Sequence, residues 1–210
     1  MQDILDALNY TFSHAKIDSN RVYITGFSGG AMVTLIMVGK YPQIWAGAAA
    51  WVPVYDLAKW YQELRKSRYS YAVHIRNSCG GPPLEGSDSF LECQRRSVSS
   101  YLKKAYGKKV PVYIAAGIND NFVLPSHSIM AFNDLAEKED RIALYDMAYI
   151  DKYRKIPDNL ESSFQDSFFS DVGLPLLFER KSNTVVLKIF EGKHDIIFNA
   201  GLYWLSKQRK

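Results

Sequence analysis

Residues 26–30, with the sequence GFSGG, are the feature that most constrains the fold of this chain. The segment before them, residues 21–25 (RVYIT), is β-branched and aromatic. The segment after them, residues 31–42 (AMVTLIMVGKYP), is apolar and ends near a proline. This composition predicts a buried strand, a tight turn and a buried helix in direct succession. Because a strand that leads into a helix is the repeating unit of a parallel sheet, we expect an α/β fold.

The same alternation continues along the chain. Further strand-like runs occupy residues 45–52 (WAGAAAWV), 110–116 (VPVYIAA) and 184–190 (TVVLKIF). Helical patterns occupy residues 2–15, residues 126–137 and the region around 202–208. Continuous apolar strands are typical of a parallel sheet that is covered on both faces. We therefore predict a mostly parallel sheet of four strands with flanking helices.

Two segments interrupt this alternation, residues 56–109 and residues 139–181. We expect them to be cap-like insertions over the carboxyl edge of the sheet, where open α/β folds bind ligands. Cys79 and Cys93 lie 14 residues apart in the first insertion, and whether they close a local disulfide depends on an oxidising compartment. Since no linker or repeat divides the chain, we predict a single domain over residues 1–210.

Composition and charge exclude several classes of protein. The chain is 47% hydrophobic and 23% charged, as in an ordinary globular domain, and no apolar run is long enough to span a bilayer. The net charge of +4 is spread along the chain without a dense basic cluster, so we expect no nucleic-acid partner. The spacing and the neighbours of the two cysteines do not suggest a zinc site, which needs about four ligands. We therefore predict no metal, no cofactor and no membrane span.

The serine of the GFSGG turn, Ser28, is the first candidate for chemistry. It matches the nucleophile elbow, G-x-S-x-G, in which a sharp strand-to-helix turn exposes the serine hydroxyl at the edge of a sheet. The pattern alone is weak, and a serine that only caps the helix is the alternative. Because the motif lies between a predicted strand and a predicted helix, we interpret Ser28 as a nucleophile.

Two partners for Ser28 follow later strands. Asp120 comes after the run 110–116, and His194 comes after the run 184–190. A histidine can take the seryl proton near neutral pH, and a carboxylate can orient the imidazole and stabilise its charged form. The alternative for Asp120 is an Asx-turn that closes its own loop. The order Ser, Asp, His is that of the α/β-hydrolases.

The remaining site residues are assigned with less support from the pattern. The other histidines, His14, His74 and His127, are expected at the surface or in packing. The N–H of Gly29, at a helix N-terminus, can donate to the oxyanion of a tetrahedral intermediate, and no segment for a second donor is recognisable. Phe27, Trp51 and Tyr55 are candidates for lining a substrate pocket of small-molecule or peptide size. For the aromatic residues after the second strand, packing between cap and sheet is the alternative.

With these residues in place, the chain resembles the carboxyl-terminal part of the catalytic domain of a prolyl-oligopeptidase-type α/β-hydrolase, a family of serine peptidases and esterases. The resemblance is most specific in residues 21–57, in GINDNFVLPSHS at 117–128 and in EGKHD at 191–195. It implies hydrolysis of an ester or peptide bond through an acyl-enzyme. The segments SCGGPP and ECQRRS resemble those of secreted or envelope-associated bacterial hydrolases, so the likeness also implies export.

Two departures from the family pattern leave alternatives open. Family peptidases usually have an aromatic residue after the nucleophile, whereas this chain has Gly29, so an esterase and a peptidase are both compatible with it. Fewer strands are predicted than this fold usually has, and the loop for the second oxyanion donor is not recognisable. We therefore expect either a fragment or a chain that completes its sheet with another chain. A catalytically silent fragment or binding module is the alternative to an enzyme.

Overall fold

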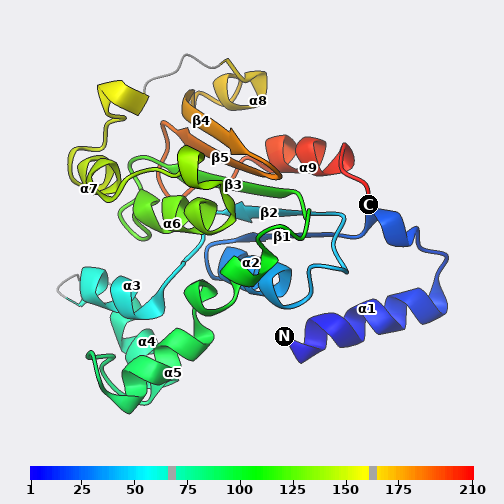
Figure 1. Cartoon of the computed structure of the whole chain (residues 1–210), viewed down its shortest axis with the longest axis horizontal. Helices are drawn as coiled ribbons and strands as arrows, with labels where there is room; N and C mark the ends of the chain where they lie inside the picture. The colour runs from blue at the N-terminus through cyan, green and yellow to red at the C-terminus, as the bar shows by residue number, and fades with distance from the viewer. Residues whose placement is uncertain (66–69, 161–164) are drawn as a thin grey trace.

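The computed structural model describes residues 1–65, 70–160 and 165–210 of the chain. Its centre is a sheet with the strand order β1-β2-β3-β5-β4 (Figure 1). Strands β1 (Tyr23–Phe27), β2 (Gly47–Trp51), β3 (Val112–Gly117) and β5 (Val185–Phe190) run parallel to one another. The predicted α/β architecture is therefore confirmed, with strand boundaries that differ from the predicted ones by up to two residues.

The sheet contains a strand that the sequence analysis did not predict. Strand β4 (Leu176–Ser182) pairs antiparallel with β5 and forms one edge of the sheet. It lies within residues 139–181 and extends one residue beyond them, so this segment is only partly an insertion. The prediction failed because β4 carries charged residues such as Glu179 and Lys181, which hide the apolar periodicity of an edge strand.

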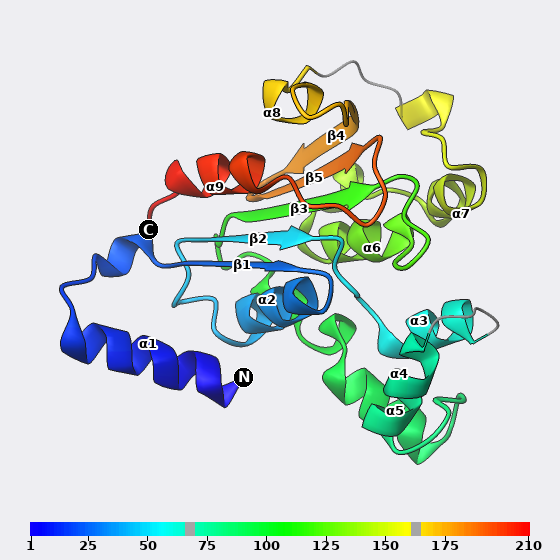
Figure 2. The same ribbon diagram turned by 180° about the vertical axis from the view of Figure 1, so that it is seen from behind.

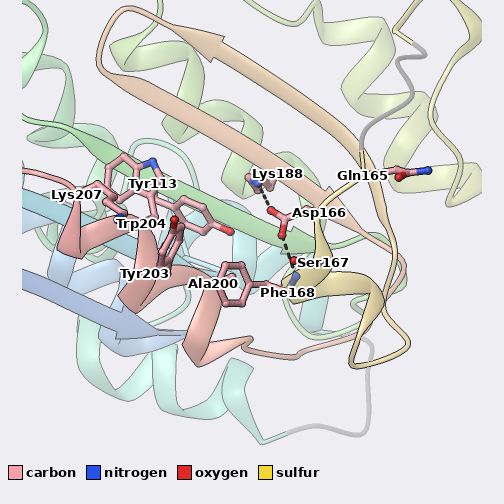
Figure 3. Close-up of a pocket in the computed structure, with 10 residues that line it drawn as sticks. All are labelled: Tyr113, Gln165, Asp166, Ser167, Phe168, Lys188, Ala200, Tyr203, Trp204 and Lys207. Atoms are coloured by element: carbon pink, nitrogen blue, oxygen red, sulfur yellow. Dashed lines mark hydrogen bonds and ion pairs between the residues drawn. The ribbon is translucent and has the colours of Figure 1, made fainter.

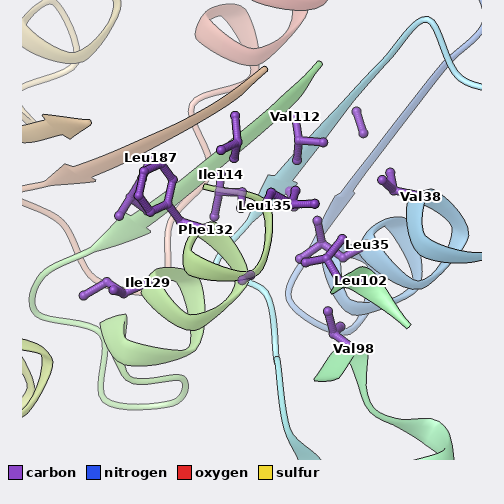
Figure 4. Packing of buried hydrophobic residues seen from close by; sticks show 14 of the residues in the cluster. Leu35, Val38, Val98, Leu102, Val112, Ile114, Ile129, Phe132, Leu135 and Leu187 are labelled. Carbon is purple, nitrogen blue, oxygen red and sulfur yellow. The ribbon is translucent and has the colours of Figure 1, made fainter. Parts of the chain in front are cut away.

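Helices cover both faces of the sheet (Figures 1 and 2). On one face, α2 (Gly29–Lys40) and α6 (Pro125–Leu135) enclose the main core, in which Leu35 and Phe132 pack with Ile114 and Leu187 of the strands (Figure 4). On the other face, α9 (Phe198–Ser206) encloses a second core that is rich in aromatic side chains. Burial on both faces explains the continuous apolar composition of β2, β3 and β5.

Three helices form a separate unit in the first predicted insertion, α3 (Leu57–Leu64), α4 (Tyr71–Cys79) and α5 (Asp88–Arg96). They share a small core of their own, and a disulfide between Cys79 and Cys93 joins α4 to α5. Figure 2 shows that β1 and β2 point toward the end of the molecule at which these helices lie. Residues 66–69 of this insertion and residues 161–164 of the second one lie outside the described residues.

The remaining elements connect or flank these layers. Helix α1 (Gln2–His14) has no buried residue and contacts the main core only through half-buried side chains such as Ile4 and Leu8. Helices α7 (Leu144–Tyr153) and α8 (Ser167–Ser170) belong to the second insertion. Short 3₁₀ turns occupy Ser19–Arg21, Val98–Ser100, Leu102–Ala105, Lys138–Asp140 and Asp158–Leu160. Among the described helices, none has the length and apolar character that crossing a membrane requires.

Candidate functional site

The carboxyl ends of three parallel strands bring the candidate residues together. Ser28 directly follows β1, Asp120 comes three residues after the end of β3, and His194 comes four residues after the end of β5. Parallel strands end at the same edge of a sheet, so loops from distant parts of the chain meet there. The residues that the sequence singled out as 28, 120 and 194 are therefore neighbours in the structure.

Ser28 lies on a sharp turn with an unusual backbone conformation. Its φ of 54° and ψ of −118° are rare for a residue with a side chain, and such strain is common at functional sites. The turn is held because the Ser28 N–H donates to the carbonyl of Trp51, with N and O 2.9 Å apart. The Ser28 side chain forms no capping hydrogen bond with α2, which argues against the capping alternative.

One glycine beside Ser28 makes this turn possible. A Cβ at Gly26 would overlap the backbone carbonyl of Gly30 and approach Oγ1 of Thr34 to 2.7 Å. At Gly29 and Gly30, by contrast, an added Cβ would meet no atom within 4 Å. Only Gly26 of the three is thus required by close packing between strand and helix.

His194 forms hydrogen bonds with both other residues. Its Nδ1 lies 2.6 Å from Oδ2 of Asp120, and its Nε2 lies 2.9 Å from Oγ of Ser28. Because an ionised carboxylate only accepts hydrogen bonds, Nδ1–H donates to Asp120, and Nε2 is left to accept the proton of the Ser28 hydroxyl. This tautomer is the one that a general base for Ser28 needs.

The Asp120 carboxylate is fully buried and uses its two oxygens differently. Oδ1 accepts the backbone N–H groups of Phe122 and Val123, at 2.7 and 3.0 Å, while Oδ2 faces His194. The Asx-turn that the sequence analysis gave as an alternative is therefore present, and it does not exclude contact with His194. Two backbone donors and an imidazole compensate for the cost of burying this charge.

Glycines also fix the loop that carries His194. A Cβ at Gly117 would overlap the carbonyl oxygen of Lys193, and one at Gly192 would overlap the ring of Phe190. The backbone N–H of Asn119 donates to the carbonyl of Gly192 over 2.8 Å. The loops after β3 and β5 are thus packed directly against each other, which sets the distance between Asp120 and His194.

Two phenylalanines flank the imidazole of His194. The ring centroid of Phe27 lies 4.8 Å from that of His194, and the centroid of Phe122 lies 5.3 Å away. Phe27 is one of the substrate-binding candidates of the sequence analysis, whereas Phe122 was missed, although its position two residues after Asp120 could have indicated it. The Phe122 carbonyl accepts the indole N–H of Trp60 over 2.6 Å, which ties α3 to this loop.

Trp51 does not line the site, and this prediction is wrong. Its side chain is 1% exposed and packs with Tyr113, Phe169 and Phe190 in the core beneath α9. The strand alternation turns Trp51 away from the face that carries α2, so only its backbone contacts Ser28. An indole in this core cannot contact a substrate at the edge of the sheet.

Tyr55 is half-buried, and its hydroxyl donates to Oδ2 of Asp134 over 2.7 Å. Burial and the neighbouring Asp134 carboxylate raise the pKa of Tyr55 above its ordinary value. The hydroxyl therefore stays protonated and joins the start of the first insertion to α6. The contacts of Tyr55 support the packing alternative that the sequence analysis left open.

The other histidines are separate from Ser28. His14 and His74 are exposed. His127 is fully buried, where its Nδ1 accepts the N–H of Tyr55 over 3.0 Å and its Nε2 lies 3.0 Å from Oε2 of Glu63. The described residues contain no group of histidine, cysteine and acidic side chains that could hold a metal ion.

Comparison with known proteins identifies the family. The model of the prolyl oligopeptidase family matches residues 1–151. The chain belongs to this family. In this member of the prolyl oligopeptidase family, the family model covers Ser28 and Asp120 but ends before His194.

Curated relatives match short stretches. Feruloyl esterase B of Talaromyces stipitatus is 43% identical over 47 residues, which are 22% of this chain and 13% of the esterase. Poly(3-hydroxyalkanoate) depolymerase C of Paucimonas lemoignei is 54% identical over 34 residues, or 16% of this chain and 8% of that protein. This chain therefore spans only a small part of the relatives it matches.

A solved structure supports the fold. The acylaminoacyl peptidase of Pyrococcus horikoshii superposes with a TM-score of 0.58 over 92% of this chain and 23% of that one, at 16% sequence identity. At this identity the likeness concerns the fold alone. The mostly parallel sheet with helices on both faces is the α/β-hydrolase fold, as the sequence predicted.

Proposed function

We propose that this chain is a part of a serine hydrolase. The enzyme cleaves ester or peptide bonds through an acyl-enzyme that forms on Ser28. The observation that carries the proposal is the chain of hydrogen bonds from Ser28 Oγ through His194 to the buried carboxylate of Asp120. The membership of the prolyl oligopeptidase family and the esterases among the curated relatives support the same chemistry.

In the first half of the reaction, His194 Nε2 takes the proton of the Ser28 hydroxyl while Oγ bonds to the carbonyl carbon of the substrate. The tetrahedral intermediate then collapses, and His194 returns the proton to the departing alcohol or amine. In the second half a water molecule attacks the acyl-enzyme, His194 takes its proton, and the acid is released as Ser28 regains its hydrogen. His194 thus ends each cycle neutral.

Asp120 acts on His194 rather than on the substrate. Its buried carboxylate keeps the proton on Nδ1 and stabilises the imidazolium that forms during attack. The N–H of Gly29, the first residue of α2, lacks a partner within its helix and can donate to the oxyanion. The positive end of the helix dipole favours negative charge at the same place.

The helices α3 to α5 are proposed as a cap over this site. Trp60 of α3 donates to the carbonyl of Phe122, and the rings of Tyr71 and Phe122 are 6.1 Å apart. Phe122 in turn flanks His194. A substrate group beside the imidazole would therefore lie against aromatic side chains of both the loop and the cap.

The decisive experiment labels the serine with a fluorophosphonate probe. We expect the parent chain to be labelled at Ser28 and to hydrolyse p-nitrophenyl acetate, and Ser28→Ala to lose both without loss of thermal stability. Asp120→Asn should keep its fold and lower kcat by about 10⁴-fold, because the imidazole loses its orienting partner. Equal ester turnover by the parent chain and Ser28→Ala would contradict the proposal.

A silent module remains the second candidate, because removal of one oxyanion donor lowers the rate about 10²–10³-fold in measured cases. A folded parent chain that resists the probe would favour this candidate. Where labelling succeeds, a series of chromogenic esters compared with aminoacyl and prolyl amides distinguishes an esterase from a peptidase. Gly29 stands where family peptidases usually have an aromatic residue, and esterases such as acetylxylan esterase are among the relatives, so we expect faster turnover of the esters.

A further inference from the structure

A cavity lies on the face of the sheet that carries α9, away from Ser28. It measures about 590 Å³, within the range of small-molecule sites, and lies between β3, β5, α8 and α9 (Figure 3). Tyr113 of β3 contributes to its wall and stands four residues before Gly117, the last residue of the strand. At 3.3 Å per residue this is about 13 Å from the edge where Ser28, His194 and Asp120 meet. The cavity is therefore distinct from the site described above.

The Tyr113 hydroxyl is the unusual feature of this cavity. The residue is 1% exposed, and its hydroxyl has no hydrogen-bond partner among the described residues. Burial and the nearby carboxylates of Asp166 and Glu179 raise the pKa of Tyr113, so the hydroxyl keeps its proton. Buried polar groups nearly always have a partner, and an unpaired one lowers stability. In Figure 3 the Tyr113 ring extends into the space between α9 and Asp166.

The charged groups of the cavity already compensate each other. Nζ of Lys188 lies 2.5 Å from Oδ2 of Asp166 and 2.9 Å from Oε2 of Glu179. Asp166 Oδ1 accepts the N–H of Phe168 over 3.1 Å. Lys207 is exposed at the mouth, where its Nζ stands over the Tyr203 ring. An ionic ligand would find no unpaired charge inside, so a neutral ligand fits better.

Aromatic rings form much of the remaining wall. The rings of Phe168 and Tyr203 lie 5.1 Å apart, and those of Tyr113 and Trp204 lie 5.5 Å apart. The faces of such rings carry partial negative charge and attract the partially positive C–H groups of a ring-shaped ligand. A ligand for this cavity thus needs an apolar face for the rings and hydroxyl groups for Tyr113 and Asp166.

We propose that this cavity binds a small neutral polyhydroxylated ring, the chemistry of a monosaccharide unit. The Tyr113 hydroxyl and the Asp166 carboxylate hydrogen-bond to hydroxyl groups of the ligand, and Phe168, Tyr203 and Trp204 pack against its C–H groups. Binding then satisfies the one buried side-chain polar atom that lacks a partner in the described part of the chain.

The test uses saturation-transfer difference NMR on the 210-residue chain with D-glucose, D-galactose, D-xylose and L-arabinose. Phenol and benzoate are added as an aromatic and an anionic comparison. We expect at least one sugar to bind, and Tyr113→Phe to weaken that binding roughly five- to tenfold, the effect of one neutral hydrogen bond. Tyr145→Phe makes the same chemical change at a residue that is 70% exposed and should leave binding unchanged.

Two further readouts separate a binding defect from a structural one. Without ligand, Tyr113→Phe should have a melting temperature equal to or above that of the parent chain, because the unpaired hydroxyl is removed. Ser28→Ala should bind the same sugar as the parent chain, because the two sites are separate. The proposal is overturned if no sugar binds, if Tyr113→Phe binds sugar as well as the parent chain, or if only phenol or benzoate binds.

Discussion

At the scale of single residues, the conformation of Ser28 depends on one glycine. The motif G-x-S-x-G does not say which of its glycines packing requires. In the structure a Cβ at Gly26 would overlap the backbone of Gly30, whereas a Cβ at Gly29 or Gly30 would meet no atom within 4 Å. The close contact lets α2 begin directly above β1, and this geometry sets the position of the Ser28 hydroxyl. The strain at φ 54° is therefore held by packing around residue 26.

Exchange of Gly26 for alanine should disrupt this turn. We expect Gly26→Ala to destabilise the fold by roughly 1–3 kcal/mol, as overpacked sites do, and to reduce fluorophosphonate labelling of Ser28. Gly30→Ala is the matched control, for which we expect unchanged labelling and a gain of up to about 1 kcal/mol from helix propensity. Urea denaturation and probe labelling measure both effects. Equal losses in the two variants would contradict this account.

The same scale shows what local sequence reveals about a site. The convergence of Ser28, Asp120 and His194 could be predicted because each lies on the turn or loop that follows a recognisable strand. Trp51 was misassigned because an apolar strand buried on both faces gives no sign of which face an aromatic side chain occupies. Phe122 was missed because its contact with His194 depends on how the loops after β3 and β5 pack.

At the scale of elements, the disulfide between Cys79 and Cys93 holds α4 and α5 together. The two cysteines are 14 residues apart in sequence, and their helices share a core with few other members. Closing a loop of this size stabilises a structure by about 3 kcal/mol in the chain-entropy model. A small core depends more strongly on such a link than the main core does.

The paired substitution Cys79→Ser and Cys93→Ser should therefore loosen α4 and α5 selectively. We expect faster hydrogen exchange in residues 71–96, by a factor that corresponds to about 3 kcal/mol, while β3 and β5 keep their protection. Mass spectrometry of peptic peptides resolves the two regions. Unchanged exchange across residues 71–96 would show that packing alone maintains this unit.

A buried pair of side chains joins α3 to α6. Glu63 of α3 lies 3.0 Å from Nε2 of the fully buried His127 at the start of α6, and it also pairs with Lys59. Burial alone would raise the pKa of Glu63, but the hydrogen bond from His127 and the charge of Lys59 outweigh it and lower the pKa below the ordinary 4.5. The ionised form of Glu63 is therefore favoured by folding.

A carboxyl group whose pKa is lowered by folding stabilises the folded state at pH values above its pKa in the unfolded chain. This stabilisation is lost as the pH falls through its pKa in the folded protein. We therefore expect Glu63→Gln to be less stable than the parent chain at neutral pH, by about 1 kcal/mol, with a gap that shrinks below pH 4.5. Urea denaturation across this range measures the gap. Glu85→Gln, which removes a carboxylate from an exposed position, is the control and should show no such gap. A gap that widens on acidification would have the wrong sign.

At the scale of the whole molecule, the two edges of the sheet differ in character. The edge strand β4 carries Glu179, Arg180 and Lys181, and charges of this kind discourage pairing with another chain. The opposite edge, β1, pairs with β2 alone among the described strands and carries no charged residue. Its backbone groups and the half-buried Ile24 and Phe27 form a surface suited to strand addition.

The exposed edge predicts self-association of the 210-residue chain at high concentration. We expect Thr25→Lys, at the exposed position in the middle of β1, to shift the equilibrium toward monomer, because a charge on an edge strand opposes pairing. Gln62→Lys adds the same charge at an exposed position of α3, away from this edge, and should have little effect. Sedimentation velocity over a concentration series compares the three proteins, and identical behaviour would argue against association through β1.

The sequence by itself determined the succession of strands and helices and the residues that follow the strands, because hydrophobic periodicity and tight turns are local properties. It also placed Ser28, Asp120 and His194 at one edge, since parallel strands end there together. Tertiary structure decided the addition of β4, the burial of Trp51, the pairing of Cys79 with Cys93 and the cavity around Tyr113. The burial of Trp51 and the cavity around Tyr113 depend on contacts between segments far apart in the chain, which no local pattern records. The pairing of β4 with β5 and of Cys79 with Cys93 joins nearby segments, and whether they pair depends on how these segments pack.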